Sequence, residues 1–349
     1  MTLFPTALFR RRSSQILLVA LLLLLLLAVS PASRWKSKWI FPNRYSDTFG
    51  YSFPIDPNDP DHQTQECGRL GDLKQLVITV KTGASEAEDR IPTLMTTSLR
   101  CAPNVFIFSD MFQDVKGYRI YDSLDDVAPE VSKENPAFEL YRLQQKLKKS
   151  HPDHFVTALK ASMSDLEKAA WDLDRYKNLH IVEKAWELRP KSDWYLHIDA
   201  DTYVFLSSLA PWLRTLEPSE QIYGGSMACV GMGFAHGGSG ILISRAATEN
   251  LVVGHKGEAA RWDPKISEFP YGDLVLAYAF KEYGIPVSNA WPIINGETPA
   301  TIPFAQHHWC QPIVTVHHIS PQEAERLGQF ERRREHPHVS THTNDNNDN

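Results

Sequence analysis

Two carboxylates, Asp199 and Asp201, are the residues of this chain whose type and spacing most clearly suit chemistry, and Ala200 alone separates them. They follow the apolar run WYLHI, which is typical of a buried strand. Because burying an unpaired carboxylate is costly, we expect a cation beside them. Mg²⁺ and Mn²⁺ prefer oxygen ligands and are commonly shared between carboxylates and the phosphates of a substrate. If the tripeptide stood alone, a surface turn with Asp accepting local backbone hydrogen bonds would be the simpler interpretation.

The residues that flank this tripeptide test two other kinds of site. A haloacid-dehalogenase phosphatase requires Thr or Val two residues after the second Asp, where this chain has Tyr203. An EF-hand calcium loop requires Gly at its sixth position and Glu at its twelfth, where Val204 and Ala210 stand. Both kinds of site are therefore excluded, and a transferase that uses a nucleotide-sugar remains.

The elements that must position these carboxylates alternate along the chain. The predicted strands are Leu76–Val80, Asn104–Asp110 and the run from Asp193 into a turn, and the predicted helices are Pro92–Arg100 and Trp171–Leu188. Repeated strand, helix, strand units predict an α/β fold with a mostly parallel sheet covered by helices on both faces.

Ligands bind to such sheets where the strands end and the helices begin. Thr82 and Asp110 stand at the ends of the first two predicted strands. We therefore expect these two residues to contact the base or ribose of a nucleotide donor, on their position alone.

The N-terminus predicts a membrane anchor. Residues 1–12 include Arg10, Arg11 and Arg12, and residues 13–33 carry no charge. These 21 residues, at about 1.5 Å each, match a hydrocarbon core of roughly 30 Å. The preceding arginines favour a cytoplasmic N-terminus and a luminal remainder, as in a single-pass type II protein of the Golgi membrane. A cleaved signal peptide is the alternative, and it delivers the rest of the chain to the same lumen.

The composition is that of a globular protein, with 42% hydrophobic and 11% aromatic residues. The formal net charge of -6 is spread along 349 residues, and no basic stripe interleaves with aromatics, which excludes nucleic acid as a partner. Residues 34–72 are rich in Pro and Asp and predict an extended luminal stem. The catalytic domain is expected over residues 73–331. Residues 332–349 have almost nothing apolar to bury, so a disordered tail is expected.

Four scattered cysteines, Cys67, Cys101, Cys229 and Cys310, agree with an oxidising lumen. They form no C-x-x-C pair of the kind that binds zinc or performs redox chemistry. Up to two disulfides can form, in three alternative pairings, and the spacing does not choose among them. Buried thiols remain the alternative.

Three blocks of the chain resemble one known family. DWYLHIDADTYV at Asp193–Val204 resembles the W-x-x-x-x-D-D-D-T-Y/F-V block of the Fringe and core-1 β1,3-galactosyltransferase superfamily, glycosyltransferase family 31. FAHGGSGILISRAA at Phe234–Ala247 and VTVHHISP at Val314–Pro321 resemble its F-x-x-G-G-x-G-x-x-x-S block and its late S-F-H segment. The KTGA, CAPNVFIFSD and LDDV stretches are similar to those of fungal members. The resemblance covers roughly residues 76–330.

This resemblance implies a GT-A fold, a UDP-sugar bound through Mn²⁺ or Mg²⁺, and inverting transfer of a hexose to a glycan or glycoprotein hydroxyl in a β1,3 linkage. Carried over by position, Asp201 would bind the metal directly and His317 would be the second protein ligand. Asp199 would support the metal or contact the donor ribose. Without the motif, His317 would be taken for a core histidine. Ala200 departs from the middle Asp of many members, so the two-acid form has to be sufficient.

Inversion by direct displacement also requires a base near the acceptor hydroxyl. Asp273 aligns with the acidic residue that opens a late helix in the superfamily, so it is the candidate base. It is equally well placed as the N-cap of a helix that ends at Gly284, a role that needs no catalysis. The family usually carries a second acid before this residue, where the chain has Gly272.

The glycines of the second block, Gly237, Gly238 and Gly240, would let the backbone approach the sugar or the acceptor closely. A flexible turn is the simpler interpretation of the same residues.

A second hypothesis for the function is a luminal glycan-binding protein on the same fold that has lost catalysis, since a fold alone does not guarantee activity. The two aspartates, the late histidine and the candidate base are all present. Their presence favours an enzyme over a binding protein.

Overall fold

The computed structural model describes residues 67–68, 70–71, 73–151, 154–306 and 308–335. The predicted anchor, nearly all of the predicted stem and most of the predicted tail lie outside these residues. Within the described part of the chain, no helix is long and apolar enough to cross a membrane. The last helix, α13 (Pro321–Glu335), continues past Arg332, where the tail was expected to begin.

An eight-stranded sheet forms the centre of the described domain, in the order β11-β7-β10-β5-β1-β2-β4-β3. Its middle strands are parallel to one another, namely β5 (Trp194–Asp199), β1 (Leu76–Lys81), β2 (Val105–Ser109) and β4 (Tyr118–Asp122). The remaining strands are β3 (Gln113–Val115), β7 (Tyr223–Gly225), β10 (Ile241–Ser244) and β11 (Val287–Asn289). The predicted α/β fold with a mostly parallel sheet is therefore confirmed, and it has the layered form of a GT-A fold.

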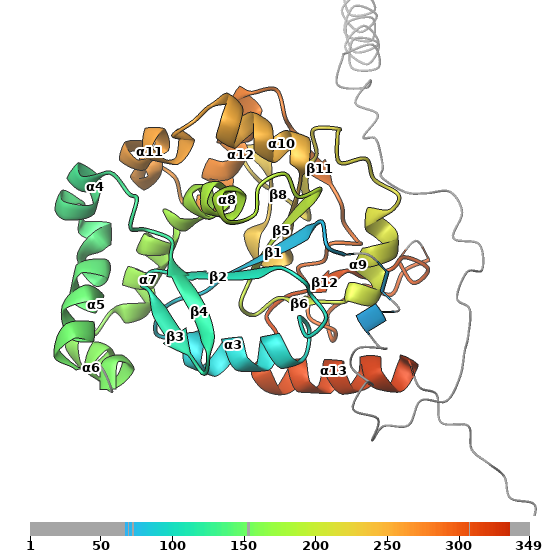
Figure 1. The fold of residues 1–349 in the computed structure, drawn as a ribbon, viewed down its shortest axis with the longest axis horizontal. Helices are drawn as coiled ribbons and strands as arrows, with labels where there is room; N and C mark the ends of the chain where they lie inside the picture. The colour runs from blue at the N-terminus through green and yellow to red at the C-terminus, as the bar shows by residue number, and fades with distance from the viewer. Residues whose placement is uncertain (1–66, 69, 72, 152–153, 307, 336–349) are drawn as a thin grey trace, which may run out of the picture. The chain divides into compact units, whose positions relative to one another are not determined.

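Helices cover both faces of this sheet (Figure 1), with α8, α10 and α12 on one side and α3 and α13 on the other. Burial explains why β1 lies at the centre, because Leu76 to Val80 are all buried. The helices are α3 (Ala87–Thr96), α4 (Pro129–Glu134), α5 (Glu139–Ser150), α6 (Phe155–Ser162), α7 (Leu166–Asp174), α8 (Lys177–Leu188), α9 (Leu206–Leu213), α10 (Arg245–Glu249), α11 (Glu258–Trp262), α12 (Gly272–Glu282) and α13.

Both predicted helices differ from the structure. The first was expected to begin at Pro92, but α3 begins at Ala87 and contains Pro92 in its second turn. The second was expected to run unbroken from Trp171 to Leu188, but α7 ends at Asp174 and α8 starts at Lys177. A continuous apolar periodicity crosses this break, so the pattern did not reveal it.

A small two-stranded sheet stands beside the main one. In it, β6 (Tyr203–Val204) pairs antiparallel with β12 (Thr315–Val316), so the segment after Asp201 lies against the segment before His317. Tyr203 is fully buried there, in a cluster with Val316, Ile319 and Ala324. Sequence-distant parts of the candidate site are thus fixed to one another by backbone pairing.

Helix α13 anchors this small sheet through a buried carboxylate. Glu331 is only 8% exposed, and burial raises the pKa of its carboxyl. The Tyr203 hydroxyl donates a hydrogen bond to its Oε2 at 2.6 Å, and the Ser207 hydroxyl contacts Oε1 at 3.3 Å. Buried polar groups of this kind depend on such partners.

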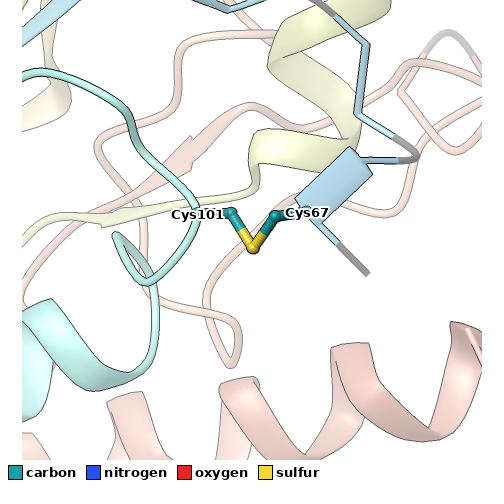
Figure 2. The surroundings of a disulfide bond; sticks show 2 residues. All are labelled: Cys67 and Cys101. Carbon is teal, nitrogen blue, oxygen red and sulfur yellow. A yellow bond between two sulfur atoms is a disulfide. The ribbon is translucent and has the colours of Figure 1, made fainter. Parts of the chain in front are cut away.

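One disulfide is formed in the described residues, between Cys67 and Cys101 (Figure 2). It joins the short segment that precedes β1 to the loop between α3 and β2. Cys229 and Cys310 are exposed free thiols. The structure thus selects one of the pairings that the spacing left open, and it forms one bridge among these four cysteines.

Replacing Tyr203 by Phe is expected to lower the free energy of unfolding by about 1–3 kcal/mol, because the buried Glu331 carboxylate loses its closest donor. Urea unfolding of the full-length chain, followed by circular dichroism, measures this change. Ser207→Ala is the matched control, since it removes the longer contact to the same carboxylate. Equal losses in the two variants would show that the Tyr203 bond does not anchor α13.

Candidate functional site

The site lies at the carboxyl ends of the central strands, where Asp199 closes β5 and Lys81 closes the neighbouring β1. These two residues are cross-strand partners in the parallel register. The Lys81 ammonium lies 3.3 Å from Asp199 Oδ1 and donates to Asp174 Oδ2 at 2.5 Å. The cation beside Asp199 in this structure is therefore a lysine side chain.

Asp201 lies in a different group, together with the two late histidines. His317 Nε2 is 3.2 Å from Asp201 Oδ1, and His318 Nδ1 is 3.8 Å from Asp201 Oδ2. One ligand atom from each of the three residues lies within 4.8 Å of the others, which is close enough to hold one metal ion. Of the three predicted metal residues, Asp201 and His317 lie together, whereas Asp199 pairs with Lys81. His318 is the third member of the cluster that could hold a metal ion.

The surroundings of the two aspartates shift their pKa values in opposite directions. Burial raises the pKa of Asp199, with Lys81 only partly opposing it. Burial also acts on Asp201, but the hydrogen bond from His317 and the charges of His317 and Arg90 leave its pKa lowered. Asp201 is therefore the carboxylate that stays ionised more readily, as a metal ligand must.

The glycine turn, residues Gly237–Gly240, lies directly against the His317 ring. A Cβ added to Gly238 would stand 2.2 Å from His317 Cε1 and 2.3 Å from Nε2, so no other residue fits without moving the ring. Gly240 has a φ of 100°, a left-handed conformation that favours glycine. The backbone of the turn thus packs closely against an imidazole of the chain itself, and its expected approach to the sugar or the acceptor stays a prediction. The turn is also tied to the motif, because Thr202 Oγ1 donates to Gly238 O at 2.7 Å.

Asp273 lies on the other side of this turn. Its Oδ2 accepts a hydrogen bond from the Gly237 N–H at 2.8 Å, and Oδ1 accepts one from the Leu274 N–H at 2.9 Å. The alternative of an N-cap is wrong, because Tyr271 occupies the cap position of α12 and Asp273 lies inside the first turn. Gly284 does follow the helix end in a left-handed conformation, as expected.

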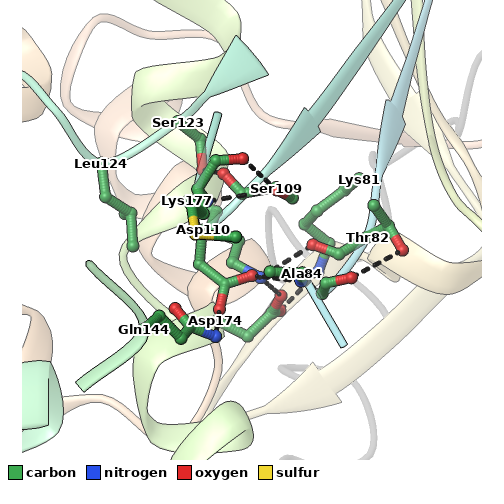
Figure 3. A network of polar contacts seen from close by, with 12 residues as sticks. Lys81, Thr82, Ala84, Ser109, Asp110, Ser123, Leu124, Gln144, Asp174 and Lys177 are labelled. Carbon is green, nitrogen blue, oxygen red and sulfur yellow. Dashed lines mark hydrogen bonds and ion pairs between the residues drawn. The ribbon is translucent and has the colours of Figure 1, made fainter. Parts of the chain in front are cut away.

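The two residues predicted to contact the donor are buried, with Thr82 5% and Asp110 2% exposed. Asp110 accepts hydrogen bonds from the Ala84 N–H at 2.8 Å and from Gln144 at 2.6 Å (Figure 3). Lys177 donates to the Thr82 carbonyl at 3.0 Å and lies 3.4 Å from Asp110. Thr82 and Asp110 thus form hydrogen bonds with other residues of the chain, in a buried polar cluster next to the carboxyl ends of β1 and β2.

Asp174, at the end of α7, connects the buried cluster around Asp110 to Lys81 and Asp199. It lies between Lys81 at 2.5 Å and Lys177 at 3.2 Å (Figure 3). Burial alone would raise its pKa, but the two ammonium groups lower it to about 2. Two lysines and the three carboxylates of Asp110, Asp174 and Asp199 thus form one nearly balanced ionic network.

Three participants were missed by the sequence reasoning: Lys81, Asp174 and His318 as a member of the metal-type cluster. Lys81 directly follows the predicted strand Leu76–Val80 that pointed to Thr82, so its position alone was a sufficient signal. His318 is next to His317 and was treated only as its neighbour. Asp174 had no signal, because it lay within a segment that was expected to be continuous helix.

A comparison with known families identifies the family of this chain. The model of a family described as Fringe-like matches residues 71–288, more than half of the chain. The matched residues include the Asp199–Asp201 motif, the glycine turn and Asp273, and they end before β12 and His317. Glycosyltransferases of this kind use a nucleotide-sugar donor and a glycan acceptor. This chain therefore belongs to the Fringe-like family and is a glycosyltransferase.

Proposed function

We propose that the chain transfers a hexose from a UDP-sugar to a glycan or glycoprotein hydroxyl, with inversion and formation of a β1,3 linkage, and that Mn²⁺ assists. The observation that carries the proposal is the convergence of Asp201, His317 and His318 within 4.8 Å, at the strand ends where donors bind in sheets of this type.

The three candidate ligands, Asp201, His317 and His318, fit a divalent cation. They offer one carboxylate with a lowered pKa and two imidazoles, and His317 Nδ1 is buried without a hydrogen-bond partner. Mg²⁺ favours oxygen ligands and retains waters, whereas Mn²⁺ also accepts imidazole, so we favour Mn²⁺. When bound, the ion would neutralise the negative charge that develops on the departing diphosphate.

The chain's own residues would do the remaining work. Asp201 and His317 would bind the metal ion that holds the UDP-sugar. Lys81 forms an ion pair with Asp199 at the end of β5. Asp273 lies across the glycine turn, where its carboxylate can take the proton from the attacking acceptor hydroxyl. The proton moves to an Asp273 oxygen as the acceptor oxygen bonds to the anomeric carbon and the diphosphate leaves.

We also propose that residues 13–33 anchor the chain in the Golgi membrane with the catalytic domain in the lumen. The uncharged segment after three arginines supports this proposal, as does the Cys67–Cys101 disulfide, since such bonds form and persist in oxidising compartments.

The metal proposal predicts that Asp201→Ala and His317→Ala each lower Mn²⁺-dependent release of UDP from a UDP-sugar by about 100-fold or more, because charge stabilisation by a metal contributes several kcal/mol. The assay uses the full-length chain with UDP-galactose, UDP-N-acetylglucosamine and UDP-glucose. His318→Ala should have a smaller effect, because its side chain is 69% exposed and lies farther from Asp201.

Asp125→Ala is the control for this series, since it removes an exposed carboxylate that pairs with Lys184. Isothermal titration with Mn²⁺ gives a second measurement that does not depend on turnover. Unchanged Mn²⁺ affinity in Asp201→Ala would contradict the proposed ligand set. A wild-type chain that binds UDP-sugars and turns over none of them would favour the glycan-binding alternative.

The base proposal predicts that Asp273→Asn lowers transfer by about 10²- to 10⁴-fold while UDP-sugar affinity stays within twofold. The amide has one acceptor oxygen, so the bond from the Leu274 N–H is lost, but that oxygen can still accept from the Gly237 N–H and the glycine turn should remain in place. Asp273→Ala removes that bond as well and should also lower the melting temperature. If Asp273→Asn transfers at the wild-type rate, the carboxylate is structural and another group takes the proton.

The topology proposal predicts that protease added to sealed microsomes removes an epitope placed before Met1 and spares one placed after Asn349. Detergent should expose both epitopes to digestion. Protection of the N-terminal epitope, or cleavage of the C-terminal one in sealed vesicles, would overturn the type II assignment.

A further inference from the structure

His236 is a partly exposed histidine directly before the glycine turn, and the proposed transfer reaction gives it no role so far. It follows the strand β9 (Met232–Ala235) and is the N-cap of the short 3₁₀ helix Gly237–Ser239. In the family block F-x-x-G-G-x-G-x-x-x-S this position is one of those left unspecified. Membership of the family therefore does not explain why a histidine stands here.

Two hydrogen bonds orient the His236 ring. The Ser239 N–H donates to Nδ1 at 3.2 Å, and the Ser239 hydroxyl oxygen lies 2.7 Å from the same nitrogen. Because a backbone N–H can only donate, Nδ1 is an acceptor, and the proton of the neutral imidazole lies on Nε2. Within the described part of the chain, both hydrogen bonds of this ring are made by Nδ1, so the Nε2–H is left to donate to a ligand.

The partner that orients the ring is itself held in place. Ser239 is only 1% exposed, and a Cβ added to Gly296 would lie 2.6 Å from its Oγ and 3.8 Å from His236 Nδ1. The backbone at Gly296 thus packs against the hydrogen-bonded pair. A side chain fixed by packing and by a second residue is suited to contact a ligand in one defined orientation.

His236 lies between the candidate base and the candidate metal ligand His317. The next residue, Gly237, donates its N–H to Asp273 Oδ2 at 2.8 Å. On the other side, the His236 ring lies edge to face against the His317 ring, with centroids 5.5 Å apart. Burial lowers the pKa of His236 and the negative charge of Asp273 partly opposes this shift, so the ring is also close enough to sense that carboxylate.

The geometry of inversion says what occupies the space between these two groups. In an inverting transfer the attacking oxygen and the leaving group lie on opposite faces of the sugar ring. The base acts on the attacking oxygen, and the metal acts on the leaving diphosphate. The hexose that is transferred must therefore lie between Asp273 and His317, and a hydrogen-bond donor placed there faces the hexose ring and not the uridine.

We propose that His236 determines which hexose is transferred, because its Nε2–H donates a hydrogen bond to a ring hydroxyl of the donor sugar. This inference rests on the proposed function and names the residue that discriminates among UDP-hexoses. Hexoses differ in the orientation or substitution of single hydroxyls, and a site with a placed polar group disfavours the sugar that leaves it unpaired. Ser239 is a positioning residue, since it acts through the His236 ring.

The test uses the full-length chain with UDP, UDP-galactose, UDP-glucose and UDP-N-acetylglucosamine. Isothermal titration in Mn²⁺ gives the affinities, and UDP release gives kcat/KM. Asparagine at position 236 has an amide oxygen near the place of Nδ1, which can accept from the Ser239 N–H, and no atom at the place of Nε2. His236→Asn should lower the affinity and kcat/KM for the preferred UDP-hexose by about 3- to 10-fold, the effect of one neutral hydrogen bond, and leave UDP affinity within about twofold.

His236→Gln is the conservative variant, because its longer side chain carries an amide N–H close to the place of Nε2. It should recover most of the preference among the three UDP-hexoses, which a purely structural role in the turn would not predict. His255→Asn is the matched control, since His255 is an exposed histidine that stacks on Tyr283 outside the site. This control should keep the wild-type preference.

The proposal is overturned if His236→Asn keeps the wild-type preference, or if it weakens UDP and the UDP-hexoses equally. Turnover of a UDP-hexose with either result would leave the transferase in place and reject only the role of His236. A loss of affinity in His236→Asn that is confined to the UDP-hexoses, in a chain that turns none of them over, would support the contact and reject the transferase. A wild-type chain that binds no UDP-sugar would reject both.

Discussion

The close packing of Gly238 on the His317 ring is the contact on which the site depends. The backbone of the turn approaches the imidazole so closely that a single methyl group would collide with it. Through this contact, β12 and the glycine turn occupy fixed positions relative to one another. The Thr202 hydrogen bond to Gly238 then ties the same turn to the segment that carries Asp201. Three segments, which carry Asp201, Gly238 and His317, converge because Gly238 lacks a side chain.

Charge balance provides the second constraint. The carboxyl ends of β1 and β5 bring Asp199 to the edge of the sheet, where an unpaired carboxylate would be costly. Lys81, from the adjacent strand, supplies the compensating charge, and Asp174 and Lys177 extend the network into the protein. The two aspartates of the motif therefore have different partners: Asp199 forms an ion pair with Lys81, and Asp201 lies against His317 and His318.

Much of the central sheet was predictable, because β1, β2 and β5 are continuous apolar runs and such runs are characteristic of strands buried on both faces. The meeting of Asp201 with His317 was expected only through the family resemblance, since no local pattern joins residues so far apart. The break between α7 and α8 was missed because both helices bury faces of similar periodicity. The Cys67–Cys101 pairing was not derivable, because spacing alone allows three connectivities.

Gly272 stands where the family usually carries an acid, and the structure gives a physical reason for the glycine. The sequence suggested a weakened match, because many relatives carry an acid there. In the structure, any side chain at this position would meet the Arg175 backbone, so glycine is the residue that allows α12 to rest on the α7–α8 junction. Asp174, the last residue of α7, directly precedes Arg175 at this junction and accepts a hydrogen bond from Lys81. The ionic network and the candidate base therefore lie next to one packing contact, since Asp174 precedes Arg175 and Asp273 follows Gly272, and a side chain introduced at residue 272 would collide with the α7–α8 junction between them.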